Sequence, residues 1–207
     1  MKTIADFRTD TLTLLGDASG RRYSNDVLDM AIREALSVTM NYHPRHSIVT
    51  ESVAQSVGRE IVLNWMPPAG GVILNIRNAS GDLLHASDYQ DGTHTILQFY
   101  GSGTVPAAGD ELSIELALPH TIQGLDSAAS TTVPDDLALT VCSGAAGYAM
   151  RIRARSVTEV FGKRPEDTER LIEQAEMMIR IFLSDLEIKY LGAYYHKDPW
   201  PLDGFPI

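Results

Sequence analysis

The chain has 207 residues, of which 44% are hydrophobic and 21% are charged, and its formal net charge is −10. This length permits a sizeable buried core, and the composition is that of a soluble globular protein. The acidic balance argues against a sequence-specific nucleic-acid binder, no apolar run approaches the ~18 residues of a membrane span, and one cysteine excludes an intrachain disulfide.

Two helices are expected in residues 1–45. The first ten residues lack the hydrophobic core of a secretory signal, so we expect the protein to stay in the cytoplasm where it is made. Residues 2–14 predict a short helix that ends at Gly16. Ser24 is the expected N-cap of a second helix, which Pro44 stops. This second helix has an apolar stripe that must be covered by other elements.

The period of the sequence pattern changes from 3.6 to 2 in the middle of the chain. Six segments alternate or are β-branched, and clusters of glycine, proline and aspartate, with Asp88 and Asp91 among the turn residues, separate them. Short strands of this kind are typical of an antiparallel sandwich or barrel. We therefore expect residues 46–133 to be an inserted, β-sandwich-like module with its linker. It contains nine acidic residues but only Arg59 and Arg77 as basic ones.

Two long helices are expected in residues 134–192. Pro134 and Pro165 each take a first-turn position, and acidic residues behind them suit the positive end of the helix dipole. Gly192 is the expected end of the second helix. With the N-terminal pair, these helices predict a core of about four helices, and hence an α+β fold.

Both long helices carry residues that indicate close packing. Glycine costs roughly 1 kcal/mol relative to alanine inside a helix, so two glycines in one turn indicate the close approach of another backbone, within the chain or from a neighbouring subunit. The second helix has an apolar face that is broader than one partner helix needs. The residues assigned to helix packing or to contacts between subunits are Gly144, Gly147, Ala149, Met178, Phe182 and Leu186.

Residues 193–207 combine prolines with aromatic side chains. The prolines forbid a helix, while disordered segments are normally poor in aromatic residues. We therefore expect an extended tail that docks either on a partner protein or back on its own chain. Its candidate docking residues are Tyr194, Tyr195, Trp200, Leu202, Phe205 and Ile207.

No set of residues indicates acid–base, nucleophilic or metal chemistry. Cys142 lies among apolar residues, and the histidines are scattered along the chain. An active site would need a pocket around Asp135, Asp136 and a histidine. We expect no enzymatic activity, no cofactor and no metal site.

Several motifs occur in a particular order along the chain. They are His120, Thr121, Gly124, Leu125, Thr131, Thr132, Val133, Pro134, Gly144, Ala145, Ala146, Tyr148 and Ala149, and the N-terminal segment YSNDVLDMAIREALSVTMNYHPR. In order and spacing they resemble the head-to-tail adaptor proteins of tailed bacteriophages, also called connector or neck proteins. The resemblance covers about half of the chain, and none of its motifs is catalytic.

The resemblance implies a structural virion protein at the head–tail interface, assembled in the host cytoplasm. A closed ring of about twelve subunits would dock on the portal protein, extend the DNA channel and hold a tail or nozzle protein below. Genomic DNA would pass without sequence-specific contact, and no membrane would be involved. In such adaptors the C-terminal segment reaches into the portal ring, which would give the aromatic tail its role.

An alternative is a tail or baseplate protein whose β-sandwich module binds a carbohydrate or a receptor. Sugar-binding platforms usually need exposed aromatic side chains. The module offers few of them beyond Trp65, Tyr89 and Tyr100.

Overall fold

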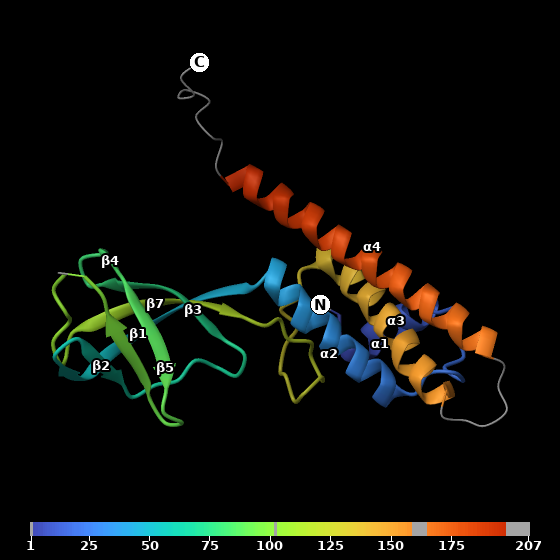
Figure 1. Ribbon diagram of the computed structural model, residues 1–207, viewed down its shortest axis with the longest axis horizontal. Coiled ribbons are helices and arrows are strands. Elements are labelled where there is room, and N and C mark those ends of the chain that lie inside the picture. The colour runs from blue at the N-terminus through green and yellow to red at the C-terminus, as the bar shows by residue number, and fades with distance from the viewer. Residues whose placement is uncertain (1, 102, 159–164, 198–207) are drawn as a thin grey trace, which may run out of the picture. The chain divides into compact units, whose positions relative to one another are not determined.

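The computed structural model describes residues 2–101, 103–158 and 165–197 (Figure 1). This part of the chain contains four α-helices and seven β-strands, and the strands form one antiparallel sheet. The α+β class that the sequence predicts is therefore confirmed. The strands lie in one compact unit, Pro44–Pro119, and the helices lie in a second unit formed by the residues on both sides of it.

Four helices make up the helical unit. They are α1 (Ile4–Leu14), α2 (Asn25–Tyr42), α3 (Asp135–Thr158) and α4 (Pro165–Lys197). Helix α3 is central, because α1, α2 and α4 each pack against it. Its residues Ala145, Ala146 and Ala149 have no exposed surface. Small side chains around the circumference of α3 let three helices approach it closely.

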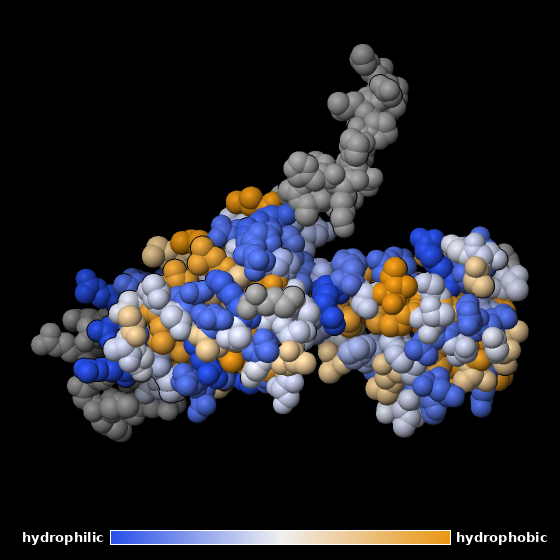
Figure 2. Space-filling model, turned by 180° about the vertical axis from the view of Figure 1, so that it is seen from behind, coloured by the Kyte–Doolittle hydropathy of each residue, from blue (hydrophilic) through white to orange (hydrophobic). Residues whose placement is uncertain are grey.

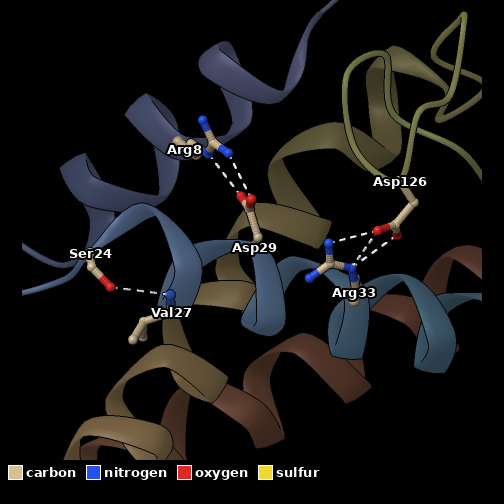
Figure 3. Close-up of polar contacts among 6 residues, drawn as sticks. All are labelled: Arg8, Ser24, Val27, Asp29, Arg33 and Asp126. Carbon is tan, nitrogen blue, oxygen red and sulfur yellow. Dashed lines mark hydrogen bonds and ion pairs between the residues drawn. The ribbon is translucent and has the colours of Figure 1, made fainter.

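The start of α2 lies where the sequence predicts it. The Ser24 hydroxyl accepts a hydrogen bond from the Val27 backbone N–H at 3.4 Å, as an N-cap does (Figure 3). Tyr23 and Leu28 flank this cap, and both are buried in the same hydrophobic cluster. Gly16 follows α1 in the left-handed conformation, with φ +61°, which glycine adopts without strain.

Helix α3 begins one residue later than the sequence predicts. Pro134 is not its first residue but precedes it, and the Pro134 carbonyl accepts hydrogen bonds from the N–H groups of Leu137 and Ala138 at 3.0 and 3.1 Å. Proline suits this position because it has no N–H group that would need a partner.

The end of α4 also differs from the predicted one. The sequence places the end of this helix at Gly192 and an extended segment in residues 193–207, whereas α4 continues to Lys197. One glycine costs roughly 1 kcal/mol in a helix interior, which is too little to stop a long helix. Pro199 is the next residue in the sequence that blocks helical hydrogen bonding.

Residues 120–133 belong to the helical unit, although the sequence assigns them to the β module with its linker. The Ile4 N–H donates to the Gln123 carbonyl at 3.0 Å, beside the first turn of α1. The Arg33 guanidinium of α2 donates to both carboxylate oxygens of Asp126 at 2.6 to 2.9 Å (Figure 3). The segment is therefore held by residues of the N-terminal helices, far away in the sequence.

The His120 side chain connects the two points at which the chain leaves and re-enters the helical unit. His43 is the last residue before the β unit, and His120 is the first residue after it. The His120 ring is buried, with Nε2 at 2.9 Å from the His43 carbonyl oxygen and Nδ1 at 2.9 Å from the Thr132 carbonyl oxygen. One side chain thus joins the end of α2 to the segment that leads into α3.

The β unit is a seven-stranded sheet. Its strands are β1 (Arg45–Val57), β2 (Glu60–Leu63), β3 (Val72–Asn78), β4 (Leu83–Leu84), β5 (Ala86–Gln90), β6 (Thr95–Phe99) and β7 (Glu111–Leu118). Their order across the sheet is β4-β3-β7-β1-β2-β6-β5. Asp88, which the sequence assigns to a turn, lies in β5.

The long strand β1 connects the two halves of this sheet. It pairs with β7 along its first part and with β2 along its second, and the register shifts between Val53 and Gln55. Such a bulge bends a strand and increases its twist. The two edge strands, β4 and β5, are separated in the chain only by His85. The expected sandwich is therefore one sheet that curls until it is nearly closed.

The inner face of the sheet is the core of the β unit. Leu112, Ile114 and Leu116 of β7 are fully buried together with Ile61 and Leu97. The alternation of apolar and polar residues in β7 thus predicts correctly which side faces the core.

Candidate interaction surface

Two glycines permit the contact between α3 and α4. A Cβ atom on Gly144 would lie 2.8 Å from the Phe182 ring. A Cβ atom on Gly147 would lie 2.8 Å from Ile179 Cγ1 and 3.2 Å from the carbonyl oxygen of Ala175. These distances are shorter than van der Waals contact, so a side chain at either position would push the helices apart. The close approach occurs between two helices of the same chain.

The residues that the sequence assigns to helix packing or ring contacts are enclosed by the helical unit. Gly144, Gly147, Ala149, Phe182 and Leu186 are buried, and Met178 is half-buried against the same core. A side chain that is buried within one chain has no surface left for a second chain. Contacts between subunits must therefore use residues other than these five buried ones.

The opposite side of α4 carries a second apolar stripe, which we call the outer stripe. Its residues Met177, Ile181 and Ile188 are 57%, 50% and 65% exposed. They are four and seven positions apart, so they share one side of the helix, away from Phe182 and Leu186. Figure 2 shows separate orange areas among blue ones on the helical unit. Because these apolar side chains are aligned and remain exposed, the outer stripe is a candidate interaction surface.

A line of charged residues runs along α4 beside the outer stripe. We call it the glutamate line, and its members are Glu169, Glu173, Glu176, Arg180 and Glu187. The spacings of four, three, four and seven place them on one side of the helix, and all are exposed. Arg180 lies 3.6 Å from Glu176, so these two charges offset each other. The remaining members are acidic.

Helix α4 is longer than its contact with α3. Lys189 donates hydrogen bonds to the backbone oxygen of Asp136, in the first turn of α3, and to Thr140 Oγ1 at 3.1 Å. Residues 190–197 therefore continue past the start of α3, over roughly 12 Å at a rise of about 1.5 Å per residue. The red end of α4 in Figure 1 is this overhang.

Some candidate docking residues of the C-terminal segment lie within the described residues, which end at Lys197, and the others lie beyond them. Tyr194 and Tyr195 lie in the overhang of α4, and not in an extended tail. The other candidates lie outside the described residues; they are Trp200, Leu202, Phe205 and Ile207. Their role in docking stays a prediction.

The turn between α1 and α2 presents two arginines to solvent. Its conformation depends on the buried Asp17 carboxylate, which accepts hydrogen bonds from the backbone N–H groups of Arg21 and Arg22 at 3.3 and 2.7 Å. Desolvation raises the pKa of Asp17, but these N–H groups and the Ser19 hydroxyl outweigh it and hold the pKa below its ordinary value. The arginine side chains are exposed.

A third arginine comes to the same place from the C-terminal part of α3. The Arg153 guanidinium lies over the Tyr23 ring, 5.1 Å from the ring centroid, and Tyr23 directly follows Arg22. We call Arg21, Arg22 and Arg153 the arginine end. Within the described part of the chain, none of these three side chains makes an ion pair.

The other candidate chemistry is limited. Burial raises the pKa of the Cys142 thiol to about 11, so this side chain is a thiol at neutral pH and a poor nucleophile. Among the residues that the structure describes, no group of three or more histidine, cysteine or acidic side chains is placed to hold a metal ion. None of the described helices is long and apolar enough to cross a membrane.

Comparison of the chain with protein-family models and with curated proteins finds no match.

Sequence reasoning missed the outer stripe and the arginine end for different reasons. Met177, Ile181 and Ile188 have the spacing of a helix face, but a broader apolar stripe on the same helix hid them. Separating the two stripes by their helical angle would have found the second one. Arg21 and Arg22 lie in a turn with no periodic pattern, so only the fold brings them to Arg153.

Proposed function

We propose that this chain is a structural adaptor at the head–tail junction of a tailed bacteriophage. Identical subunits form a closed ring that docks on the portal protein, extends the DNA channel and offers an attachment surface to tail components. The observation that carries the proposal is the two-sided α4. One side packs on α3 through Phe182, and the other exposes Met177, Ile181 and Ile188. A helix with a second, unused apolar side suits a subunit of an assembly.

The motifs behind the adaptor resemblance support the proposal by their place in the fold. His120 and Thr132 join the end of α2 to the segment before α3, and Gly144 sets the distance between α3 and α4. Residues of the resembling motifs thus build the helical unit itself. Motifs that hold helices and connecting segments together fit a protein whose task is to hold other proteins in place.

The overhang of α4 is the proposed portal contact. Residues 190–197 extend past α3 and lead into the segment with Trp200 and Phe205. Aromatic side chains are frequent anchors of protein interfaces. In the proposal this arm, with the residues that follow it in the sequence, reaches the portal ring, while the rest of the helical unit contacts neighbouring subunits.

Deletion of residues 194–207 tests the portal contact. The shortened chain should keep the circular dichroism spectrum and the melting temperature of the full chain, because the helical core lies before this segment. It should no longer bind the portal protein in a pull-down with purified components. Undiminished binding would refute the assignment of the portal contact to this segment.

One observation favours the alternative function. Tyr89 and Tyr100 are exposed, and the pairing of β5 with β6 places both on the outer face of the sheet. Two tyrosines on one face could stack on sugar rings, and the Tyr100 hydroxyl already contacts Ser87 Oγ at 2.5 Å. Trp65 packs against the core instead. Glycan-array binding by the full chain that is lost in Tyr89→Ala and Tyr100→Ala would favour this function.

A further inference from the structure

We infer that the outer stripe and glutamate line of one copy bind the arginine end of the next copy, so that subunits associate head to tail. The inference rests on the proposed function, because it names the two surfaces that a ring of identical subunits needs. The occupant of the exposed α4 face is therefore a second copy of this chain.

Charge complementarity is the first argument. The chain has a net charge of −10, yet Arg21, Arg22 and Arg153 gather at one place. None of them makes an ion pair within the described residues, whereas Arg8 and Arg33 each form an ion pair with an aspartate. The glutamate line presents the opposite charge next to an apolar stripe. A positive patch and a negative patch on the same protein favour association between copies.

The geometry of α4 disfavours the simplest alternative, a symmetric dimer through the outer stripe. In a two-fold contact that runs two copies of α4 antiparallel, the same flank of each helix meets its counterpart. The glutamate line, including Glu169, Glu173 and Glu187, would then face itself. Like charges at an interface cost free energy and are avoided by specific interfaces. The stripe therefore suits a partner surface that is basic.

The two surfaces are different parts of the subunit, and this decides the symmetry. The glutamate line lies on the side of α4 that faces away from α3, and the arginine end is built from the α1–α2 turn and the C-terminal part of α3. A contact between two different surfaces is heterologous, so each added subunit leaves one of each surface free. Such a contact produces a ring when its rotation closes and a filament when it does not.

Charge reversal with rescue tests the inference. Arg21→Glu with Arg22→Glu, or Glu169→Arg with Glu173→Arg, should each weaken self-association of the full chain by about tenfold or more, because like charges then meet. Combining all four changes in one chain should restore association, because the charges are again complementary. Sedimentation velocity measures the assembly at low and high salt, with and without portal protein. Arg59→Glu with Arg77→Glu is the matched control, with the same change in charge on the β unit, and should assemble like the wild type.

The outcomes separate this inference from the proposed function. If the chain assembles on portal and neither reversal changes its assembly, the inference is overturned and the adaptor function stands. If the variant that combines all four substitutions does not regain self-association, the inference is also overturned, because the two surfaces then do not meet. If the reversals and the rescue behave as expected but the chain ignores portal protein, the inference stands and the proposed function fails. A wild-type chain that never self-associates overturns the inference.

Discussion

The ring of Phe182 lies directly against the backbone of Gly144, so that a Cβ atom on this glycine would be 2.8 Å from the ring carbons. This contact, between the middle of α3 and the middle of α4, fixes the distance between the two longest helices of the chain. It also orients α4, because the side that faces away from Phe182 is the side that carries the outer stripe.

Gly144→Ala should destabilise the helical unit although alanine is the better helix former. The added methyl group overlaps the Phe182 ring, and overpacking costs about 1–3 kcal/mol, while the gain in helix propensity is roughly 1 kcal/mol. We expect a net loss of about 1 kcal/mol in the free energy of unfolding, measured by urea denaturation. Gly103→Ala, where a Cβ meets nothing within 4 Å, is the control and should not destabilise.

A double-mutant cycle shows whether the overlap is the cause. Phe182→Leu leaves space beside residue 144, so Gly144→Ala should cost less in that background than in the wild type. Equal costs in both backgrounds would mean that Gly144 is required for some reason other than the Phe182 ring.

Two ion pairs of α2 should differ in their contribution to stability. Arg8 donates two hydrogen bonds of 2.7 Å to Asp29, which is 17% exposed, whereas Arg33 holds Asp126, which is 60% exposed (Figure 3). Arg8→Met leaves a largely buried carboxylate without its partner and should cost about 1.5–3 kcal/mol. Arg33→Met should cost about 0–1 kcal/mol, because water replaces the arginine. Equal losses in thermal denaturation of the two variants would contradict this ranking.

The stability of the fold should depend on pH through Glu115, which lies on the outer face of the sheet. Hydrogen bonds from Asn75 Nδ2 at 2.7 Å and from His46 at 3.1 Å hold the pKa of this carboxyl group below its ordinary value. Because the pKa is lower in the folded state than in the unfolded state, Glu115 stabilises the fold above its unfolded pKa. This contribution is lost as the pH falls through the folded pKa.

Asn75→Ala should therefore raise the pKa of Glu115 and move acid unfolding to a higher pH. Carboxyl carbon shifts in an NMR titration report the pKa, and circular dichroism reports unfolding. Asn64→Ala, at an exposed asparagine directly after β2, should leave both unchanged. An unaltered Glu115 titration in Asn75→Ala would show that His46 alone is sufficient.

The outer stripe should be important for assembly and unimportant for folding. Ile181→Ser with Ile188→Ser removes apolar side chains that are already exposed, so the melting temperature should change little, since surface substitutions usually alter stability by about 0.5 kcal/mol or less. Self-association in sedimentation velocity should fall strongly. Ile179, two positions away, is partly buried against the core and is the contrast: Ile179→Ser should lower the melting temperature. Wild-type assembly by the stripe variant would exclude this face as a subunit contact.

The sequence predicts the elements of this fold better than their limits and their partners. Ser24 and Pro134 mark helix starts within one residue, because capping depends on local chemistry. Gly192 does not end α4, because its cost is small compared with the stability of a long helix. The alternation in β7 predicts its buried side, but not that one bulged strand, β1, joins all strands into a single sheet.

The candidate surface was harder to predict, because it depends on what other residues cover. Phe182 and Met177 both lie in apolar stripes of α4, and only the position of α3 decides which of the two is buried. Arg22 and Arg153 are far apart in the sequence, and the stacking of Arg153 on Tyr23 brings them together. Such juxtapositions arise from tertiary packing and leave no local pattern.

The mass of the protein in solution, alone and mixed with a phage portal protein, tests the central claim most directly. The account predicts that chains of 22.7 kDa assemble into a closed particle that binds the portal. A ring of about twelve subunits would have a mass of roughly 270 kDa, and reversal of Arg21 and Arg22 should dissociate it. A 22.7 kDa species at every concentration and salt level, unchanged by portal protein, would contradict the account.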